Sequence, residues 1–520
     1  MGSTTLPVER CPETRNLDGA RPRRVRAAAW VRAAFGAALW LGAAPAAAEP
    51  FPSHDFAIDL FQGPILAPIR VTGIAGSYAG YAEGIEGMVS NAAAPAVREP
   101  FSFNWLEFDA AVSISIPLSL FENNDFDNSN ALDSDFSNFI YLTGGVLLQA
   151  GILALGANAE LQRYTITGST GGETSVTVGK YHVLAGIRLL GDQLVFGAGP
   201  RAVTLGLNAP NANLTFAGVA PEIGVLVRPD WQSFRIGATY RMPVTASGLL
   251  GEADTVEPSG RRLAGGLVLP EKVVLPWEVE AGVAIQVGPR PLNPEWIDPH
   301  AQEAELAADF ERRRVAREHA RQRQIVREPD PMLRAKLARD LALEEKRRAA
   351  DEDRRLEAAR ARLKRERRAR YWNWPRPHLL FTAEVLITGP VSSAVTLAQF
   401  LGQNEPSDVC RDVPPEERPA CETKQAQPGN AGSEVNFGPR FGIETEPVPG
   451  LVKTRFGSYY EPNRLDDGRV GRQHFTFGAD LRAFPSTWWG LVPEVIYKLQ
   501  TSFDLAPRYQ SLSAGIGVWH

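Results

Sequence analysis

Cysteine, methionine and histidine are scarce in this sequence, whose 520 residues contain three Cys, four Met and seven His. The histidines are scattered, and no HExxH, CxxC, GxSxG or P-loop motif occurs in a suitable context. We therefore expect no metal site, no cofactor and no catalytic site. His474 and Asp480 lie about 20 Å apart along one predicted strand, so they cannot pair within it. A hydrolase with its Ser and His on different strands stays open at this point.

Long apolar runs are also missing. Beyond residue 48 there is no run of about 18 apolar residues, which argues against a helical membrane protein. Strands of a membrane barrel leave a weaker hydropathy signal, because every second residue faces the lumen. The mean hydropathy of −0.18 therefore does not exclude such a barrel. The length would suit two to four soluble domains or one large β-barrel.

The first 48 residues have the features of a secretory signal peptide. Arg21–Arg26 is basic, Ala33–Ala44 is a short apolar stretch, and Ala46–Ala48 forms an A-x-A cleavage site before Glu49. The alternative, an anchor helix, would need a longer apolar stretch to span a bilayer. We therefore expect the protein to be exported.

Export bears on the two cysteines that remain after cleavage, Cys410 and Cys421, which lie close together in a Pro- and Glu-rich stretch. In an oxidising compartment the two could form a disulfide. A metal site there would need a nearby His or a second Cys pair, and this stretch contains neither.

The strongest pattern in the chain is a two-residue alternation in His474–Phe484. If this stretch is a strand, Phe475, Phe477, Ala479, Leu481 and Ala483 lie on one face, and His474, Thr476, Gly478, Asp480 and Arg482 on the other. Similar alternation occurs in Phe234–Val244, Trp277–Val287 and Val435–Thr445. An apolar outside against lipid and a charged inside would produce it, although a sandwich or propeller remains an alternative. The polar residues predicted to face the lumen are Arg235, Arg241, Glu278, Glu280, Arg440, Glu444, Asp480 and Arg482.

Fourteen strands are predicted in all, an even number that returns both chain ends to the same side of a membrane. They are Phe103–Phe121, Phe139–Leu148, Ile152–Ile166, Ser175–Leu190, Leu194–Leu207, Val219–Arg228, Ser233–Val244, Trp277–Val287, His378–Thr388, Val435–Thr445, Leu451–Asn463, Gln473–Phe484, Val492–Phe503 and Ser511–His520. With both ends in the periplasm, the long connections Glu122–Asn138, Thr245–Pro276 and Gly389–Glu434 fall outside the cell. Seven tryptophans are then expected at the periplasmic ends, as in an interfacial aromatic belt: Trp105, Trp231, Trp372, Trp374, Trp488, Trp489 and Trp519.

One periplasmic connection, between the eighth and ninth strands, is long and charged. Its core, Ala301–Arg370, holds 22 Lys and Arg against 15 Asp and Glu, a net charge of +7. Good helix formers dominate, and Pro329-Asp330-Pro331 interrupts them. We expect two long helices that project into the periplasm, with an apolar stripe too thin for a stable coiled coil. In an exported protein the Arg-rich end, Arg360–Arg370, favours contact with phosphate-bearing lipid or an acidic partner, or plain solvation, over nucleic acid.

The segment before the first strand carries a resemblance to a known family. Arg70–Arg98 is rich in Gly and Ala, which permit close backbone packing. It resembles the N-terminal plug of the outer-membrane long-chain fatty-acid and hydrocarbon transporters, which has an A-E pair ahead of an Asn-Pro-Ala motif. The matching positions are Gly76, Ala79, Ala82, Glu83, Asn91 and Pro95, although three alanines here separate the Asn from the Pro. Stretches such as Phe456–Pro462 also resemble the family.

Pattern and resemblance together predict an all-β membrane protein, a 14-stranded antiparallel outer-membrane β-barrel of a Gram-negative-type bacterium. The expected division is a signal peptide (1–48), a plug (49–102), strands one to eight (103–288), a helical insertion (289–376) and strands nine to fourteen (377–520).

The resemblance implies passive uptake of hydrophobic compounds such as long-chain fatty acids, with Gly76–Pro95 as the gate and exit through a gap in the wall. It also implies outer-membrane lipid and the barrel-assembly machinery as partners. The expected ligand contacts are apolar residues at an exposed surface: Leu249, Leu250, Leu267, Leu269, Leu397, Phe400 and Leu401.

Two other functions stay open. The barrel could be an anchor whose insertion, residues 301–370, binds a periplasmic partner or the cell wall, or it could be a nonspecific porin.

Overall fold

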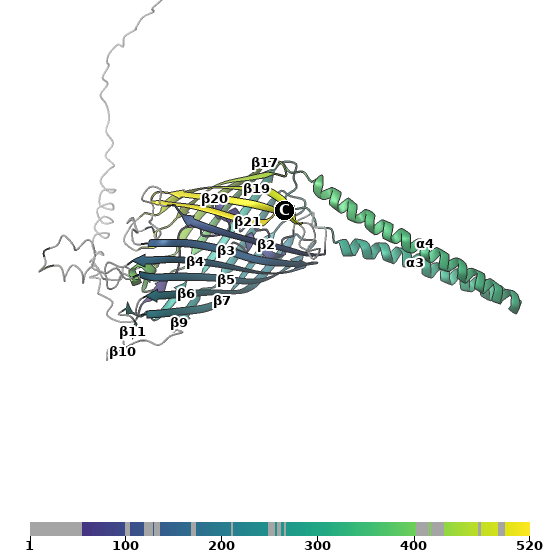
Figure 1. Ribbon diagram of the computed structural model, residues 1–520, viewed down its shortest axis with the longest axis horizontal. Helices are drawn as coiled ribbons and strands as arrows, with labels where there is room; N and C mark the ends of the chain where they lie inside the picture. The colour runs from purple at the N-terminus through teal and green to yellow at the C-terminus, as the bar shows by residue number, and fades with distance from the viewer. Residues whose placement is uncertain are drawn as a thin grey trace, which may run out of the picture. The chain divides into compact units, whose positions relative to one another are not determined.

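A closed barrel of 14 antiparallel strands dominates the computed structural model (Figure 1). The residues that the structure describes are 55–98, 105–118, 128, 136–167, 173–209, 212–247, 255–256, 262–264, 267–401, 414, 417, 431–465, 470–486 and 495–519. The predicted signal peptide, Cys410, Cys421, Leu249, Leu250, Trp488 and Trp489 lie outside the described residues.

The barrel strands follow one another along the chain, and β21 pairs with β2 to close the ring. They are β2 (Leu106–Pro117), β3 (Phe136–Ala150), β4 (Leu153–Thr167), β5 (Glu173–Leu189), β6 (Leu194–Ala209), β7 (Ala212–Val227), β8 (Phe234–Arg241), β14 (Glu278–Val287), β15 (Leu379–Thr388), β17 (Asn436–Val448), β18 (Val452–Glu461), β19 (Arg472–Ser486), β20 (Val495–Ala506) and β21 (Tyr509–Val518). Each predicted strand corresponds to one of these, so the predicted barrel is confirmed.

Side-chain alternation accounts for the two faces of the wall. In β19, Phe475 and Leu481 are exposed on the outer face, while His474 and Asp480 are buried on the inner face. Backbone polar groups in lipid must bond to one another, and a closed ring of strands leaves no unpaired edge. An apolar outer face on a closed ring is therefore a surface suited to a bilayer.

The two ends of the barrel differ in their connections. One end, here called the turn end, has tight connections such as 190–193 and 449–451 but also the long connection 288–378. The other end, here called the loop end, has the long connections after β8 and β15 and the tight connection 507–508. Trp105, Trp231 and Trp372 are exposed at the turn end, as expected of an aromatic belt. Trp519 is not part of such a belt, because it is buried and Lys453 covers its ring at 4.7 Å.

Two predicted loops contain short elements that alternation did not reveal. A four-stranded sheet joins β16 (Ala394–Thr396), β1 (Ala57–Asp59), β13 (Lys272–Leu275) and β9 (Val244–Ser247), with β1 parallel to both of its neighbours. A smaller sheet joins β10 (Thr255–Val256), β11 (Arg262–Ala264) and β12 (Leu267–Val268), and α5 spans Leu397–Leu401. Strands of two to four residues are too short to show a period.

Two long helices, α3 (Pro299–Arg327) and α4 (Pro331–Trp372), lie between β14 and β15 and run side by side (Figure 1). They form the two-helix insertion that the composition predicts and are called the helical hairpin below. Ion pairs join them, including Arg317 to Glu352 at 2.6 Å and Arg367 to Glu303 at 3.2 Å. Among the described residues, none of the helices combines the length and the apolar character needed to cross a bilayer.

The outer face provides a test of the barrel's depth in a membrane. Phe441 lies at the middle of β17 and Val448 at its turn end, and both are exposed. Phe441→Arg should lower the free energy of unfolding in lipid by roughly 2–4 kcal/mol, and Val448→Arg by about 1 kcal/mol or less. Reversible denaturant unfolding in lipid vesicles measures both. Equal losses for the two variants would contradict a bilayer-spanning wall.

Candidate functional site

The barrel interior is filled by residues 55–98, here called the luminal segment. It contains β1, α2 (Ile69–Gly73) and the 3₁₀ turns η1 (Glu86–Val89) and η2 (Ala94–Ala96), and most of its side chains are buried. Tyr78 and Tyr81 meet edge to face, with ring centroids 5.5 Å apart, and pack with apolar wall residues such as Leu380. The segment therefore has an apolar core of its own inside the lumen.

Wall glycines allow the luminal segment to approach the strands closely. A Cβ on Gly237 would lie 2.0 Å from the Ala79 carbonyl oxygen, and one on Gly197 would lie 1.9 Å from that of Ala92. Several wall glycines meet the segment in this way at inward positions: Gly186, Gly197, Gly224, Gly237, Gly282, Gly442, Gly457 and Gly478. This set is called the glycine belt below. At most of these positions a larger residue would displace the segment, while at Gly282 a Cβ would be tight, at 3.1 Å from the Gly80 nitrogen.

The glycine belt predicts a specific sensitivity. Gly237→Ala should push the luminal segment away from β8, lower the unfolding free energy by about 1–3 kcal/mol and raise ion leak in planar bilayers. Gly206→Ala on β6 is the control, because a Cβ there lies 3.8 Å from the nearest atom. If both variants leak and unfold like the native protein, the close contact does not hold the segment.

Buried charges attach the luminal segment to the wall. Arg70 donates from Nε and Nη2 to the two oxygens of Glu444, at 3.1 and 3.0 Å. Arg455 bonds the same carboxylate at 2.6 Å and reaches both oxygens of Asp480, at 2.6 and 2.7 Å. In this chain of four alternating charges, each charged group is bonded to one of opposite sign. Removing one member of such a buried set typically lowers the free energy of unfolding by about 3–5 kcal/mol.

A second attachment uses Glu384 on β15, whose Oε2 accepts hydrogen bonds from the backbone N–H groups of Tyr78 and Ala79, at 2.9 and 2.6 Å. Arg440 bonds Glu384 at 3.0 Å and donates to the Gly76 carbonyl at 3.3 Å. Gly76 has a φ of +68°, a conformation that a glycine adopts without strain. Gly76 and Ala79 thus form the backbone turn that this carboxylate holds.

Asn91 occupies the centre of the contact with β7 and β8. Its Nδ2 donates to the carbonyls of Ala79, at 2.9 Å, and Val225, at 3.1 Å, and its Oδ1 accepts from the N–H of Ala93 at 2.9 Å. One side chain therefore joins two turns of the luminal segment to the wall. Ala82 packs in the same apolar core as Tyr78, and the carbonyl of Pro95 accepts a bond from Gln149 Nε2 at 2.8 Å.

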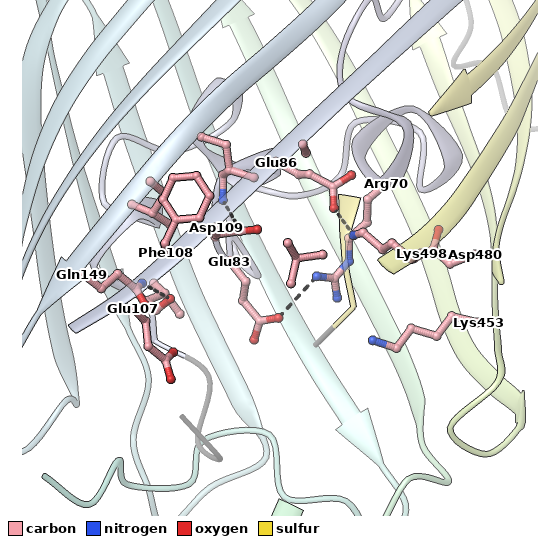
Figure 2. A pocket seen from close by; sticks show the side chains of 16 residues that line it. Arg70, Glu83, Glu86, Glu107, Phe108, Asp109, Gln149, Lys453, Asp480 and Lys498 are labelled. Atoms are coloured by element: carbon pink, nitrogen blue, oxygen red, sulfur yellow. Dashed lines mark hydrogen bonds and ion pairs between the residues drawn. The ribbon is translucent and has the colours of Figure 1, made fainter. Parts of the chain in front are cut away.

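Toward the turn end, a polar cavity of about 40 Å³ lies beneath the segment (Figure 2). Figure 2 shows Glu83 and Glu86 of the segment directed toward Arg70 and Lys498. Glu83 also pairs with Arg235 on β8 at 2.7 Å, and Gln500 donates to Glu86 at 2.9 Å. Both acidic side chains of this stretch are thus paired with cations.

The state of Glu83 determines how this attachment responds to pH. Burial would raise the pKa of its carboxyl, but Arg235 and Arg70 outweigh burial and lower the pKa to about 2. A lowered pKa means that the attachment is complete above the unfolded pKa, about 4.3, and is lost as pH falls through about 2.

We therefore expect ion leak and protease resistance of the luminal segment to stay constant from pH 7 to pH 5. Glu83→Gln should increase both leak and cleavage at each pH, because it leaves Arg235 without its anion. Glu357→Gln, an exposed position on α4, serves as the control. A leak in the native protein that rises steeply between pH 7 and pH 5 would contradict this assignment.

Residues 288–298, here called the strap, lie across the turn end ahead of α3. Asn293 Nδ2 donates to the carbonyls of Pro229 and Phe234, at 2.9 and 2.7 Å, and its Oδ1 accepts from Arg235 Nε at 2.7 Å. Arg235 also donates to the carbonyls of Leu292 and Tyr81, at 2.6 and 2.8 Å. The strap and the luminal segment therefore share one guanidinium.

Trp296 fixes the far end of the strap. Its ring is buried, with the guanidinium groups of Arg98 and Arg188 at 4.3 and 4.7 Å from it. Arg98 ends the luminal segment and donates to the carbonyls of Trp105 and Gln149, at 2.8 and 2.9 Å. The turn end is thus covered by the strap in addition to the luminal segment.

Beside β5 to β7 the loop end of the lumen is apolar, which alternation did not predict. Inward residues of β5 to β7, including Val178, Leu205 and Phe216, form a buried cluster with Phe56 and Ile58. Leu267, Leu269 and Phe400, expected at an exposed surface, are buried in this cluster, and Leu397 and Leu401 are half-buried against it. These leucines turn inward because the inner wall opposite them is apolar too.

Beside this cluster lies a cavity of about 110 Å³, here called the apolar chamber. Phe61, Leu66, Phe139, Tyr164, Val178 and Leu397 contribute apolar surface to it. Its cation, Arg464, is bonded to Asp59 at 2.7 Å. An apolar cavity of this order, ~150 Å³ in a well-studied case, holds a benzene-sized molecule.

Below the chamber, across the turn Phe61–Leu66, lies a charged cavity of about 100 Å³. Arg201, Arg241, Glu278 and Glu280 line it, with Arg201 bonded to Glu278 at 2.7 Å. The other polar residues predicted to face the lumen lie in the attachments described above, except Arg482. That side chain lies at the turn end, where its guanidinium covers the ring of Trp372 at 5.2 Å.

The backbone pairing of the wall next to this charged cavity is interrupted, although the strands stay close together. Pro200 on β6 lies opposite Pro221 on β7, and no pairing joins Val183 and Leu184 of β5 to Gly199 and Pro200. Proline removes a ladder hydrogen bond and is rare in central strands. On the outer face of the same strands, β5 to β8, lies an apolar groove of about 680 Å³. Sequence reasoning passed over these prolines, which were the available signal.

His474, which the sequence excluded from pairing with Asp480, contacts other carboxylates. Its Nδ1 lies 2.8 Å from Asp504 and its Nε2 lies 2.7 Å from Glu461, and its ring stacks on Tyr459 at 4.2 Å. Both ring nitrogens are thus bonded within the wall.

These features define a membrane β-barrel whose lumen is filled by its own N-terminal segment. No protein-family model and no curated protein matches the chain. Similar solved structures include the CymD monoaromatic hydrocarbon channel, 9% identical, TM-score 0.43, covering 87% of this chain and 96% of that one. Others are an FadL homologue of Pseudomonas aeruginosa (10%, 0.42, 91% and 98%) and the Pseudomonas putida toluene transporter TodX (10%, 0.40, 90% and 99%). At such identities and scores they carry no argument about function, which must come from this chain's own residues.

Proposed function

We propose that this protein is an outer-membrane channel of a Gram-negative-type bacterium for the passive uptake of hydrophobic compounds, such as long-chain fatty acids. The apolar chamber is the observation that carries the proposal. It lies between the loops and the luminal segment, where a compound entering from outside would arrive first, and its main charge is already paired. With the turn end facing the periplasm, the luminal segment acts as the plug.

The proposed gate is Gly76–Pro95. Asn91 holds this stretch by bonds to Ala79 and Val225, and Glu384 holds the turn at Tyr78 and Ala79. Ligand in the chamber would press on the Phe61–Leu66 turn, which borders both the chamber and the charged cavity. Displacing that turn would connect the two cavities.

The proposed exit is the break in backbone pairing between β5 and β6, where the strands could separate. A lateral route supports hydrophobic cargo, because the outer groove there is apolar and would deliver the compound to lipid. An aqueous route through the turn end would expose the cargo to water and would have to displace the strap.

Uptake of a labelled fatty acid and of an uncharged aromatic compound by cells tests the proposal. Val178→Lys should reduce uptake at least tenfold, because it places an unpaired charge in the apolar chamber. Val470→Lys is the matched control, since Val470 is 77% exposed and does not line the chamber. Equal uptake by the two variants at equal outer-membrane levels would sink the proposal.

A deletion variant distinguishes the channel from an anchor. Deleting residues 301–370 should leave uptake intact in a channel, whereas an anchor that binds a periplasmic partner through the helical hairpin would lose that partner. The exposed, charged surface of the hairpin favours the anchor as a second role. The filled lumen disfavours a nonspecific porin. Persistent ion conductance of the native protein in planar bilayers would favour the porin again.

A further inference from the structure

The helical hairpin carries a basic surface that the transport proposal does not use. In the last turns of α4, Arg360, Lys364 and Arg368 are spaced four residues apart and are exposed, and Arg365 is exposed beside them. Residues four apart lie on one side of a helix, so these side chains form a single row. We call these four residues the basic face.

The side chains of the basic face are exposed, and Arg360 borders the side of α4 that meets α3, because it lies seven residues before Arg367. The side of α4 that meets α3 carries Arg367, which is buried and bonded to Glu303 at 3.2 Å. Arg360, Lys364 and Arg365 are exposed, and no ion pair joins them to another of the described residues. The neighbouring Arg362, by contrast, pairs with Glu366 at 3.5 Å. Three cations of the basic face are therefore available to an external anion.

The row leads to the membrane surface. Trp372 continues the same four-residue spacing at the end of α4, and it is 55% exposed beneath Arg482 of the barrel. Seven residues later β15 begins with Leu379 exposed on the outer face. Exposed tryptophans at a barrel end lie at the level of the lipid headgroups. With a rise of 1.5 Å per residue, Lys364 lies about 12 Å and Arg360 about 18 Å from Trp372.

On this side of α4 the charge changes from positive to negative beyond about 18 Å from Trp372. On the same side of α4, seven residues before Arg360 and Lys364, lie Asp353 and Glu357, both exposed. A polyanion lying along the whole hairpin would meet these acidic residues, whereas a lipid headgroup at the base would not. The charge pattern therefore favours a ligand that is confined to the membrane surface.

We propose that the basic face binds the phosphate headgroups of anionic phospholipids, such as phosphatidylglycerol, in the periplasmic leaflet. Each Lys or Arg near an anionic surface strengthens binding by about 1 kcal/mol, or roughly fivefold. Three such residues would make the base of the hairpin a selective lipid contact. This role is independent of the uptake proposal, because a barrel that transports nothing would retain it.

The test compares two triple variants of the full-length protein that lose the same charge. R360Q/K364Q/R365Q removes the basic face, and R339Q/K346Q/R347Q removes three exposed cations at least about 37 Å farther along α4 than Trp372. Glutamine keeps a high helix propensity, so both variants should fold. Circular dichroism checks this, because the two variants should have equal helix content and equal melting temperatures.

Native mass spectrometry then measures retained phosphatidylglycerol against phosphatidylcholine of the same acyl chains. The native protein and the distal variant should prefer phosphatidylglycerol, and the basic-face variant should lose that preference by tenfold or more. Raised salt should weaken it. Equal preference in both variants, or none in the native protein, overturns the proposal. So does a basic face that retains only an acidic protein, which would make it a protein-binding surface.

Discussion

The structure depends on a contact between two backbones inside the barrel. The luminal segment meets the wall at the glycine belt, where even one Cβ would overlap a carbonyl, as at Gly237 and Gly197. Such contact fixes the depth and rotation of the segment more tightly than side-chain packing could. The hydrogen bonds of Asn91 and Glu384 become possible only at this separation, because their acceptors and donors are main-chain groups.

The polar interior follows from the same geometry. Charged groups buried in a lumen without bulk water must be paired. The structure pairs them in chains of alternating charge, such as Arg70, Glu444, Arg455 and Asp480. The loop half of the lumen is different, because valine, leucine and phenylalanine line it between β5 and β7. Along β5 to β7 the interior is thus apolar near the loops, whereas at β18 to β20 the same end holds the buried charges of Glu461, His474 and Asp504. The fold places the apolar part where a hydrophobic compound would arrive.

Alternation in the sequence was enough to predict all fourteen strands, because a wall with lipid on one face repeats the two-residue period in each of them. It could not separate the apolar inner face of β5 from an outer face, since Val176 and Val178 alternate like any lipid-facing pair. It also presented the inward glycines, such as Gly282 and Gly478, without indicating what they contact. Their contacts are with the luminal segment, which lies more than 150 residues away along the chain.

Other parts of the site could not be predicted from the sequence for a related reason. The candidate gate residues were marked by composition and resemblance, but their attachment points, such as Val225 and Glu384, come from distant strands. The strap looked like an ordinary loop because Asn293 and Trp296 acquire their partners only when the barrel closes. Leu267 and Phe400 were misjudged because the apolar surface that buries them belongs to other strands.

The position of strand β1 constrains the order in which parts of this protein can fold. Its residues, Ala57–Asp59, lie between β13 and β16, which are separated from them by more than 200 and 330 residues of chain. This early part of the chain therefore has to wait for strands that are made much later. Contacts of such long sequence separation form slowly. Any factor that keeps this segment extended until the later strands arrive would speed assembly, and early collapse of the segment onto itself would delay it.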